Sequence, residues 1–151
     1  MTVKRFTLAL TMFLVMCILI GCGKNNKLIK IEKNYEDMHK YEVSITTEKN
    51  VYSVDDTVIK YFIHNPTSKE QPYIFDYTYL QKFDDGEWKT LAFKDEEKYF
   101  YGLGGGIPPG ATLERKMKLD EEFYLPLDEG LYRIVKDDGF SVMISNEFEI
   151  K

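Results

Sequence analysis

The feature that most constrains the fold is a series of short β-forming runs between residues 41 and 151, separated by turn-forming residues. In residues 57–65, for example, Ile59, Tyr61 and Ile63 occur at every second position, which places them on one face of a strand. About seven such runs occupy some 110 residues, and none has a convincing helical period. The pattern predicts an all-β protein, built as an antiparallel β-sandwich of about seven strands.

A β-hairpin is predicted near the middle of the series. Residues 73–83 put four aromatic side chains on one face of a strand, at Tyr73, Phe75, Tyr77 and Tyr79. Asp84, Asp85 and Gly86 follow as residues that tolerate a positive φ, and residues 87–91 return with Trp88. Further strands are predicted at residues 112–119, 130–136 and 146–150.

Tyr132 adds a more specific marker of the fold. An acidic turn and Gly130 lead into Tyr132, and Ile134 follows two residues later. This spacing matches the tyrosine corner of immunoglobulin-like sandwiches, in which the tyrosine hydroxyl bonds to the backbone near the preceding turn. Antibody domains carry a cysteine at the position of Ile134, so packing takes the place of the disulfide here. The alternative is that Tyr132 is simply a core aromatic residue.

Several short motifs stand in order along residues 41–151. Their residues are Tyr52 with Asp56, Asn65, Gly86 with Trp88, Pro109 with Gly110, and Leu127 with Gly130, Tyr132 and Arg133. Together they resemble the bacterial immunoglobulin-like domain found in lipoproteins and membrane-tethered proteins of Gram-positive bacteria. The resemblance implies an immunoglobulin-like β-sandwich over residues 41–151, with structural roles for Trp88, Gly130 and Tyr132. No catalytic residues come with it, because the motifs concern the scaffold.

The N-terminus is predicted to be a lipoprotein signal peptide, residues 1–21. Residues 6–20 are apolar and follow Lys4 and Arg5, and the run is too short to span a bilayer comfortably. It ends in residues 19–22, Leu-Ile-Gly-Cys, which resemble the lipobox of bacterial lipoproteins, where the cysteine is diacylated and becomes the new N-terminus. We therefore expect lipid attachment at Cys22 and a location on the extracytoplasmic face of the cell membrane. The alternative is an uncleaved helical anchor.

Residues 22–40 are polar and rich in lysine, and we expect them to form the lipidated N-terminus and a flexible tether. The alternative is a short first strand within residues 28–32. Removal of residues 1–21 takes away Lys4 and Arg5, which lowers 20 basic residues to 18 against 25 acidic ones and changes the net charge from −5 to −7. Such a surface repels nucleic acid, so no nucleic-acid partner is expected.

The residue types that commonly support catalysis or metal binding are sparse. Cys17 leaves with the signal peptide and Cys22 is acylated, so the mature chain offers no thiolate. His39 and His64 stand in no recognisable nucleophile or metal motif. The paired carboxylates lie beside turns and are interpreted as solvated loops, with calcium binding as the alternative. We expect no metal, no cofactor and no enzymatic activity.

The glycine-rich residues 99–110 are the remaining unusual stretch. No Lys-Ser/Thr pair and no helix follow the glycines, which argues against a phosphate site. The sequence predicts a mobile loop, on which Tyr99, Tyr101 and Ile107 could form an exposed contact patch. The chain is thus predicted to be a non-enzymatic extracellular binding or accessory module with an envelope or extracellular protein as partner. The alternative is a cell-surface protease inhibitor that uses this loop.

Replacement of Cys22 by serine should abolish lipid attachment, because serine cannot form the thioether and the processing signal is lost. Mass spectrometry of the membrane-extracted variant checks this prediction. A Cys22→Ser chain that still carries diacylglycerol would show that Cys22 is not the attachment point.

Overall fold

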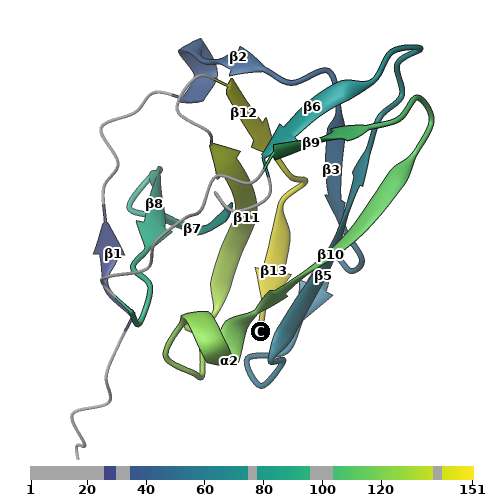
Figure 1. Cartoon of the computed structure of the whole chain (residues 1–151). Coiled ribbons are helices and arrows are strands. Elements are labelled where there is room, and N and C mark those ends of the chain that lie inside the picture. The colour runs from purple at the N-terminus through teal and green to yellow at the C-terminus, as the bar shows by residue number, and fades with distance from the viewer. Residues whose placement is uncertain (1–25, 30–34, 75–77, 96–103, 138–140) are drawn as a thin grey trace, which may run out of the picture.

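The computed structural model describes residues 26–29, 35–74, 78–95, 104–137 and 141–151, which fold mainly as β-strands (Figure 1). Eight strands form one large sheet, in the order β1, β8, β7, β11, β12, β2, with β13 pairing both β11 and β4. Their bounds are β1 (Leu28–Ile29), β2 (His39–Lys40), β4 (Val51–Tyr52), β7 (Thr78–Asp84), β8 (Glu87–Leu91), β11 (Gly130–Asp137), β12 (Ser141–Ile144) and β13 (Phe148–Ile150).

A second, small sheet packs against the large one. It contains β10 (Thr112–Lys118), β5 (Val58–His64) and β3 (Ser44–Thr47), in that order. Side chains of both sheets meet in one buried core, to which β5 contributes Ile59 and Ile63 and the large sheet contributes Leu80 and Ile134. Burial of these apolar side chains is the main stabilising contribution to such a fold. The predicted immunoglobulin-like β-sandwich is confirmed. It differs from the prediction in two parallel pairs, β12 with β2 and β13 with β4, and in more than about seven strands, since the two-residue strands β2 and β4 were not predicted.

Short elements complete the described fold. A two-stranded sheet pairs β6 (Gln71–Ile74) with β9 (Gly104–Ile107), and the helices are a 3-10 turn, η1 (Tyr35–Asp37), and one helical turn, α2 (Leu119–Glu122). α2 was not foreseen, and it turns Leu119 and Phe123 into the core next to β10. Among the described residues, no helix is both long and apolar enough to cross a membrane.

The predicted β-hairpin is present as β7 and β8, but its first strand begins at Thr78. The prediction of one continuous strand over residues 73–83 is wrong, because Tyr73 lies in β6, which pairs with β9 in another sheet, and Phe75 and Tyr77 lie outside the described residues. Phe83 pairs with Trp88 and Asp84 pairs with Glu87, which leaves Asp85 and Gly86 as the two turn residues. Their φ angles are 51° and 82°. A two-residue turn with positive φ at both positions matches the twist of the flanking strands, and aspartate followed by glycine is a preferred pair there.

The tyrosine corner is also present. The Tyr132 hydroxyl donates a hydrogen bond to the Asp128 carbonyl oxygen at 2.6 Å, and the Tyr132 ring stacks on Phe148 with centroids 6.2 Å apart. Burial raises the pKa of the Tyr132 hydroxyl well above its usual value. Gly130 has a φ of 152°, and a Cβ there would lie 2.8 Å from the Lys82 side chain. Glycine is therefore favoured on conformational grounds where β11 begins, while the nearby atom is the flexible end of the Lys82 side chain and can move.

The expectation of a tether over residues 22–40 is wrong for the described parts of that range. Leu28 and Ile29 pair with Leu91 and Thr90 of β8, and this confirms the alternative of a short first strand at those two positions. Asn26 is bound to the backbone of Tyr124, from which its side-chain oxygen accepts at 2.9 Å. Further along, β2 pairs with β12. These residues join the domain because the edges of β8 and β12 offer unpaired backbone groups.

Replacement of Tyr132 by phenylalanine should destabilise the domain by about 1–3 kcal/mol, because the partly buried Asp128 carbonyl loses its donor while the ring remains. Chemical denaturation of the purified chain measures the change in the free energy of unfolding. An unchanged midpoint would mean that Tyr132 contributes only as a core aromatic residue.

Candidate functional site

Ile107, one of the three residues predicted to form a contact patch, lies in the core. It is fully buried, at 0% exposed, and pairs with Gln71 at the end of β9. The prediction of an exposed contact is wrong for Ile107, and the prediction of a mobile loop is wrong for residues 104–107, which form a paired strand. Tyr99 and Tyr101 lie outside the described residues.

Asn65 explains why the chain around Ile107 is ordered. Its buried side-chain amide donates to the carbonyl oxygens of Ile107 and Lys69, each at 2.8 Å. Its side-chain oxygen accepts from the backbone N–H of Thr67 at 2.9 Å and from the Thr67 hydroxyl at 2.7 Å. A buried amide with its donors and acceptor satisfied holds the two chain segments together. The sequence marks Asn65 as a motif residue but does not reveal these partners.

The outer face of the large sheet, which points away from the small sheet, is a better candidate site. Directly paired residues share a face, so the pairs Phe83–Trp88, Gln81–Arg133 and Leu131–Glu149 all lie opposite the buried Leu80, Tyr132 and Ile134. Val51 pairs with Glu149, and Ile29 pairs with Thr90, on the same outer face. We call Ile29, Val51, Phe83, Trp88, Leu131 and Arg133 the outer patch.

An arginine and two aromatic rings form the centre of the outer patch. The Arg133 guanidinium reaches across β7 to lie 4.3 Å from the centroid of the Trp88 ring. Its Nε–H donates to the Gln81 side-chain oxygen at 2.8 Å. The Phe83 ring packs edge-on against the Trp88 ring, with centroids 5.3 Å apart and ring planes at 61°. Cation–π stacking and the hydrogen bond hold Arg133 in one orientation.

Only part of the outer face is left uncovered by the described chain. The segment around η1 packs on the part of the outer face formed by the end of β11 and by β12. There Tyr35 and Met38 cluster with Val135, Val142 and Ile144. Tyr35 is buried there, and burial together with the Asp137 carboxylate raises the pKa of its hydroxyl. The outer patch begins where this cover stops. Phe83, Ile29 and Val51 are each 43% exposed.

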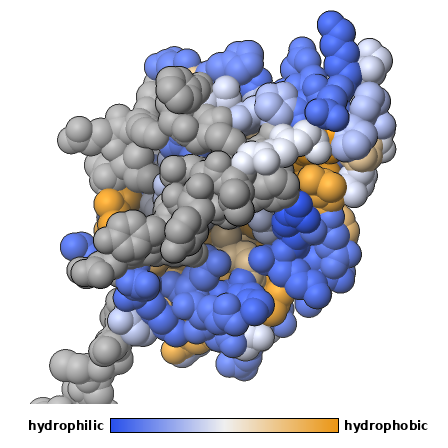
Figure 2. Space-filling model, viewed as in Figure 1, coloured by the Kyte–Doolittle hydropathy of each residue, from blue (hydrophilic) through white to orange (hydrophobic). Residues whose placement is uncertain are grey.

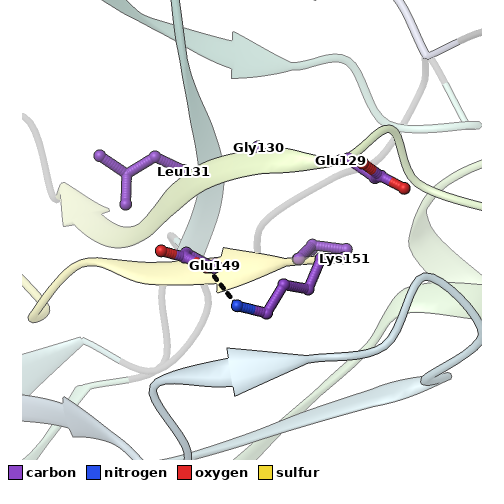
Figure 3. Close-up of a pocket in the computed structure, with 6 residues that line it drawn as sticks. Glu129, Gly130, Leu131, Glu149 and Lys151 are labelled. Atoms are coloured by element: carbon purple, nitrogen blue, oxygen red, sulfur yellow. Dashed lines mark hydrogen bonds and ion pairs between the residues drawn. The ribbon is translucent and has the colours of Figure 1, made fainter.

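An open depression adjoins the outer patch along β11 and β13. It has a volume of about 510 Å³ and is lined by Glu129, Gly130, Leu131, Glu149, Ile150 and Lys151 (Figure 3). Leu131 belongs both to the depression and to the outer patch. The Lys151 ammonium pairs with the Glu149 carboxylate at 2.8 Å, so the depression combines the apolar residues Leu131 and Ile150 with charged groups.

The outer patch carries apolar, aromatic and cationic groups, which suit binding. Within the described ranges, no three His, Cys, Asp or Glu side chains come together as a metal site would require. In the view of Figure 2 most of the described surface is hydrophilic, and hydrophobic residues show in separate small areas. The predicted lipid site, Cys22, lies outside the described residues.

Sequence reasoning missed the outer patch although a signal was present. Of the aromatic residues that the sequence places at odd positions, Tyr79 lies in β7, and the odd positions of β7 are the outer ones, because Leu80 is fully buried on the other face. Phe83 continues the odd series and pairs with Trp88. The alternation of side chains along a strand assigns residues to two faces, but it does not show which face is covered by the rest of the chain.

A family model described as a bacterial Ig-like domain matches residues 39–149 of the chain. No curated protein matches the chain.

Several solved structures align with the chain at low identity and with TM-scores below 0.5. A β-glucosidase, EmGH1, from Erythrobacter marinus is 8% identical with a TM-score of 0.43, over 74% of this chain and 15% of that one. The DNA glycosylase AlkC from Pseudomonas fluorescens is 15% identical with a TM-score of 0.39, over 74% and 31%. The sporulation control protein Spo0M from Bacillus subtilis is 18% identical with a TM-score of 0.39, over 76% and 50%. None of them bears on the activity of this chain, which spans half or less of each.

Replacement of Arg133 by alanine should expose the Trp88 ring and move its fluorescence emission to longer wavelength, because Trp88 is the chain's one tryptophan. The free energy of unfolding should fall by about 1 kcal/mol as the stacking and the bond to Gln81 are lost. Arg133→Lys is the matched variant: it keeps the charge but not the planar stacking group, and it should give an intermediate shift. An unchanged spectrum for Arg133→Ala would contradict the stacked arrangement.

Proposed function

We propose, from the premise that this chain belongs to the family of bacterial Ig-like domains, that it is a lipid-anchored binding or accessory module without catalytic activity of its own. The family match covers residues 39–149, which is most of the chain. Motifs that match such a domain build a scaffold, and function on a scaffold resides in surface sites. The proposal therefore depends on the outer patch and on the N-terminus.

The single observation that carries the binding role is the concentration of exposed apolar residues on one sheet face. Of the four large hydrophobic residues that are exposed within the described ranges, Ile29, Val51 and Phe83 belong to the outer patch. Single exposed hydrophobic residues are ordinary, whereas several on one sheet face around an aromatic–arginine centre are typical of an interaction surface. The outer patch is the part of the domain through which we expect a partner to bind.

The N-terminal sequence supports a membrane location. The apolar run at residues 6–20 and the Leu-Ile-Gly-Cys stretch fit export followed by diacylation of Cys22. Two acyl chains anchor a protein stably, at roughly 0.8 kcal/mol for each buried methylene group. On this proposal the domain stands on the extracytoplasmic face of a Gram-positive cell membrane and meets an envelope or extracellular protein there.

Cross-linking in intact membranes, followed by pull-down of the lipidated chain, tests the binding role. We expect a partner that is captured by the wild type and lost with Phe83→Thr, which removes the aromatic anchor from an exposed strand position. Val58→Thr is the matched control, because Val58 is 38% exposed but lies on the small sheet. Equal capture by wild type and Phe83→Thr, or no capture by either, would refute a binding role of the outer patch.

A further inference from the structure

We infer that the occupant of the outer patch is an extended, basic segment of a partner protein, with apolar side chains that lie on Phe83 and Leu131. This inference rests on the proposed function and gives the partner a chemical class. It is supported by the shape of the outer patch, by the charges at its rim and by its size.

The outer patch is a row that crosses several strands. Trp88 of β8 pairs with Phe83 of β7, and Leu131 of β11 pairs with Glu149 of β13, which in turn pairs with Val51 of β4. Five neighbouring strands at about 4.8 Å spacing give the row a length of roughly 19 Å. An extended peptide of about six residues has the same length, at roughly 3.3 Å per residue. Alternate side chains of such a segment would face the row.

The rim of the row is acidic. Asp85 lies in the turn beside Phe83, with its side chain 88% exposed, and Glu149 lies in the row itself, with its side chain 54% exposed. Glu129 is exposed at the edge of the adjoining depression. Lys151 pairs with Glu149, but such an exposed pair is weak and can be exchanged for a partner's cation. Lys89 is only 18% exposed and lies 3.5 Å from Asp85, with Asp84 as its closer partner.

Charge complementarity therefore favours a basic occupant. The chain as a whole carries 25 acidic against 20 basic residues, so a cationic segment is attracted before it makes contact. Arg133 keeps its positive charge, because neither the Trp88 ring nor the neutral Gln81 oxygen neutralises it, so the attraction has to come from the acidic rim and from the net charge of the chain. Apolar contacts with Phe83 and Leu131 then supply the short-range part of the affinity.

The dimensions of the outer patch argue against a second copy of this chain as the occupant. A stable interface buries about 800 Å² on each partner. A row roughly 19 Å long and two residues wide offers on the order of 300 Å². Two copies of an acidic chain also repel each other, since each carries a net charge of −5. A short peptide segment needs less area and brings the opposite charge.

Intrinsic fluorescence gives a direct test, because the chain's one tryptophan, Trp88, belongs to the outer patch. The lipidated full chain, held in a neutral detergent, is titrated with two synthetic peptides of about seven residues, which span roughly 23 Å when extended. One alternates lysine with leucine, and the other has glutamate in place of each lysine. We expect a saturable change in Trp88 emission with the basic peptide and none with the acidic peptide.

Variants separate the apolar and the charged contributions. Phe83→Thr should weaken binding of the basic peptide by about tenfold or more, as expected for an aromatic anchor. The double variant Glu129→Gln, Glu149→Gln should weaken it by a smaller factor and make it less sensitive to salt. Val58→Thr on the small sheet should bind like the wild type.

Three results would overturn the inference: equal responses to both peptides, no response to the basic peptide, or equal binding by Phe83→Thr and wild type. The membrane cross-linking experiment distinguishes this failure from that of the proposed function. If capture depends on Phe83 while the basic peptide fails to bind, the binding role stands and the basic class of partner is wrong.

Discussion

The alternation of side chains along β11 is the constraint on which both faces of the large sheet depend. β11 pairs with β7, β12 and β13, so its register is transmitted to most of that sheet. A slip of one residue would turn Tyr132 and Ile134 outward and carry Arg133 into the core. The hydrogen bond from Tyr132 to Asp128 opposes such a slip, because only one register brings the two groups together. The same bond that closes the core thus also presents Arg133 on the outer face.

Sequence reasoning succeeded where the information is local. The turn at Asp85 and Gly86 follows from the φ preferences of two adjacent residues, and the corner at Tyr132 lies four residues from its acceptor, Asp128. It failed where the partner is distant along the chain. The order of residues 104–107 depends on Asn65, which is 42 residues from Ile107, and β1 is too short to have a period of its own. The outer patch was missed because alternation cannot tell the covered face from the open one.

Stability and recognition are carried by different residues of the same strands. In β7, Leu80 is fully buried, whereas Phe83 is 43% exposed and adds little to the core. In β11, Tyr132 and Ile134 pack inward between residues that point outward. Substitutions on the outer face therefore change the binding surface at small cost to folding. A domain of this kind can acquire different partners through changes at Ile29, Val51, Phe83 and Leu131, while the motif residues Trp88 and Arg133 stay in place.

If Cys22 carries the lipid, the hydrogen bonds between Asn26 and Tyr124 limit the distance between the domain and the membrane. Three residues lie between Cys22 and Asn26, and a fully extended chain from one to the other reaches at most about 14 Å. With a connecting segment this short, the sandwich would lie against the lipid headgroups. The edge of the sheet that carries Asn26 and β1 would face the membrane. The partners of the domain would then be met within a thin layer above the bilayer, and proteins deeper in the envelope would have to reach down to that layer.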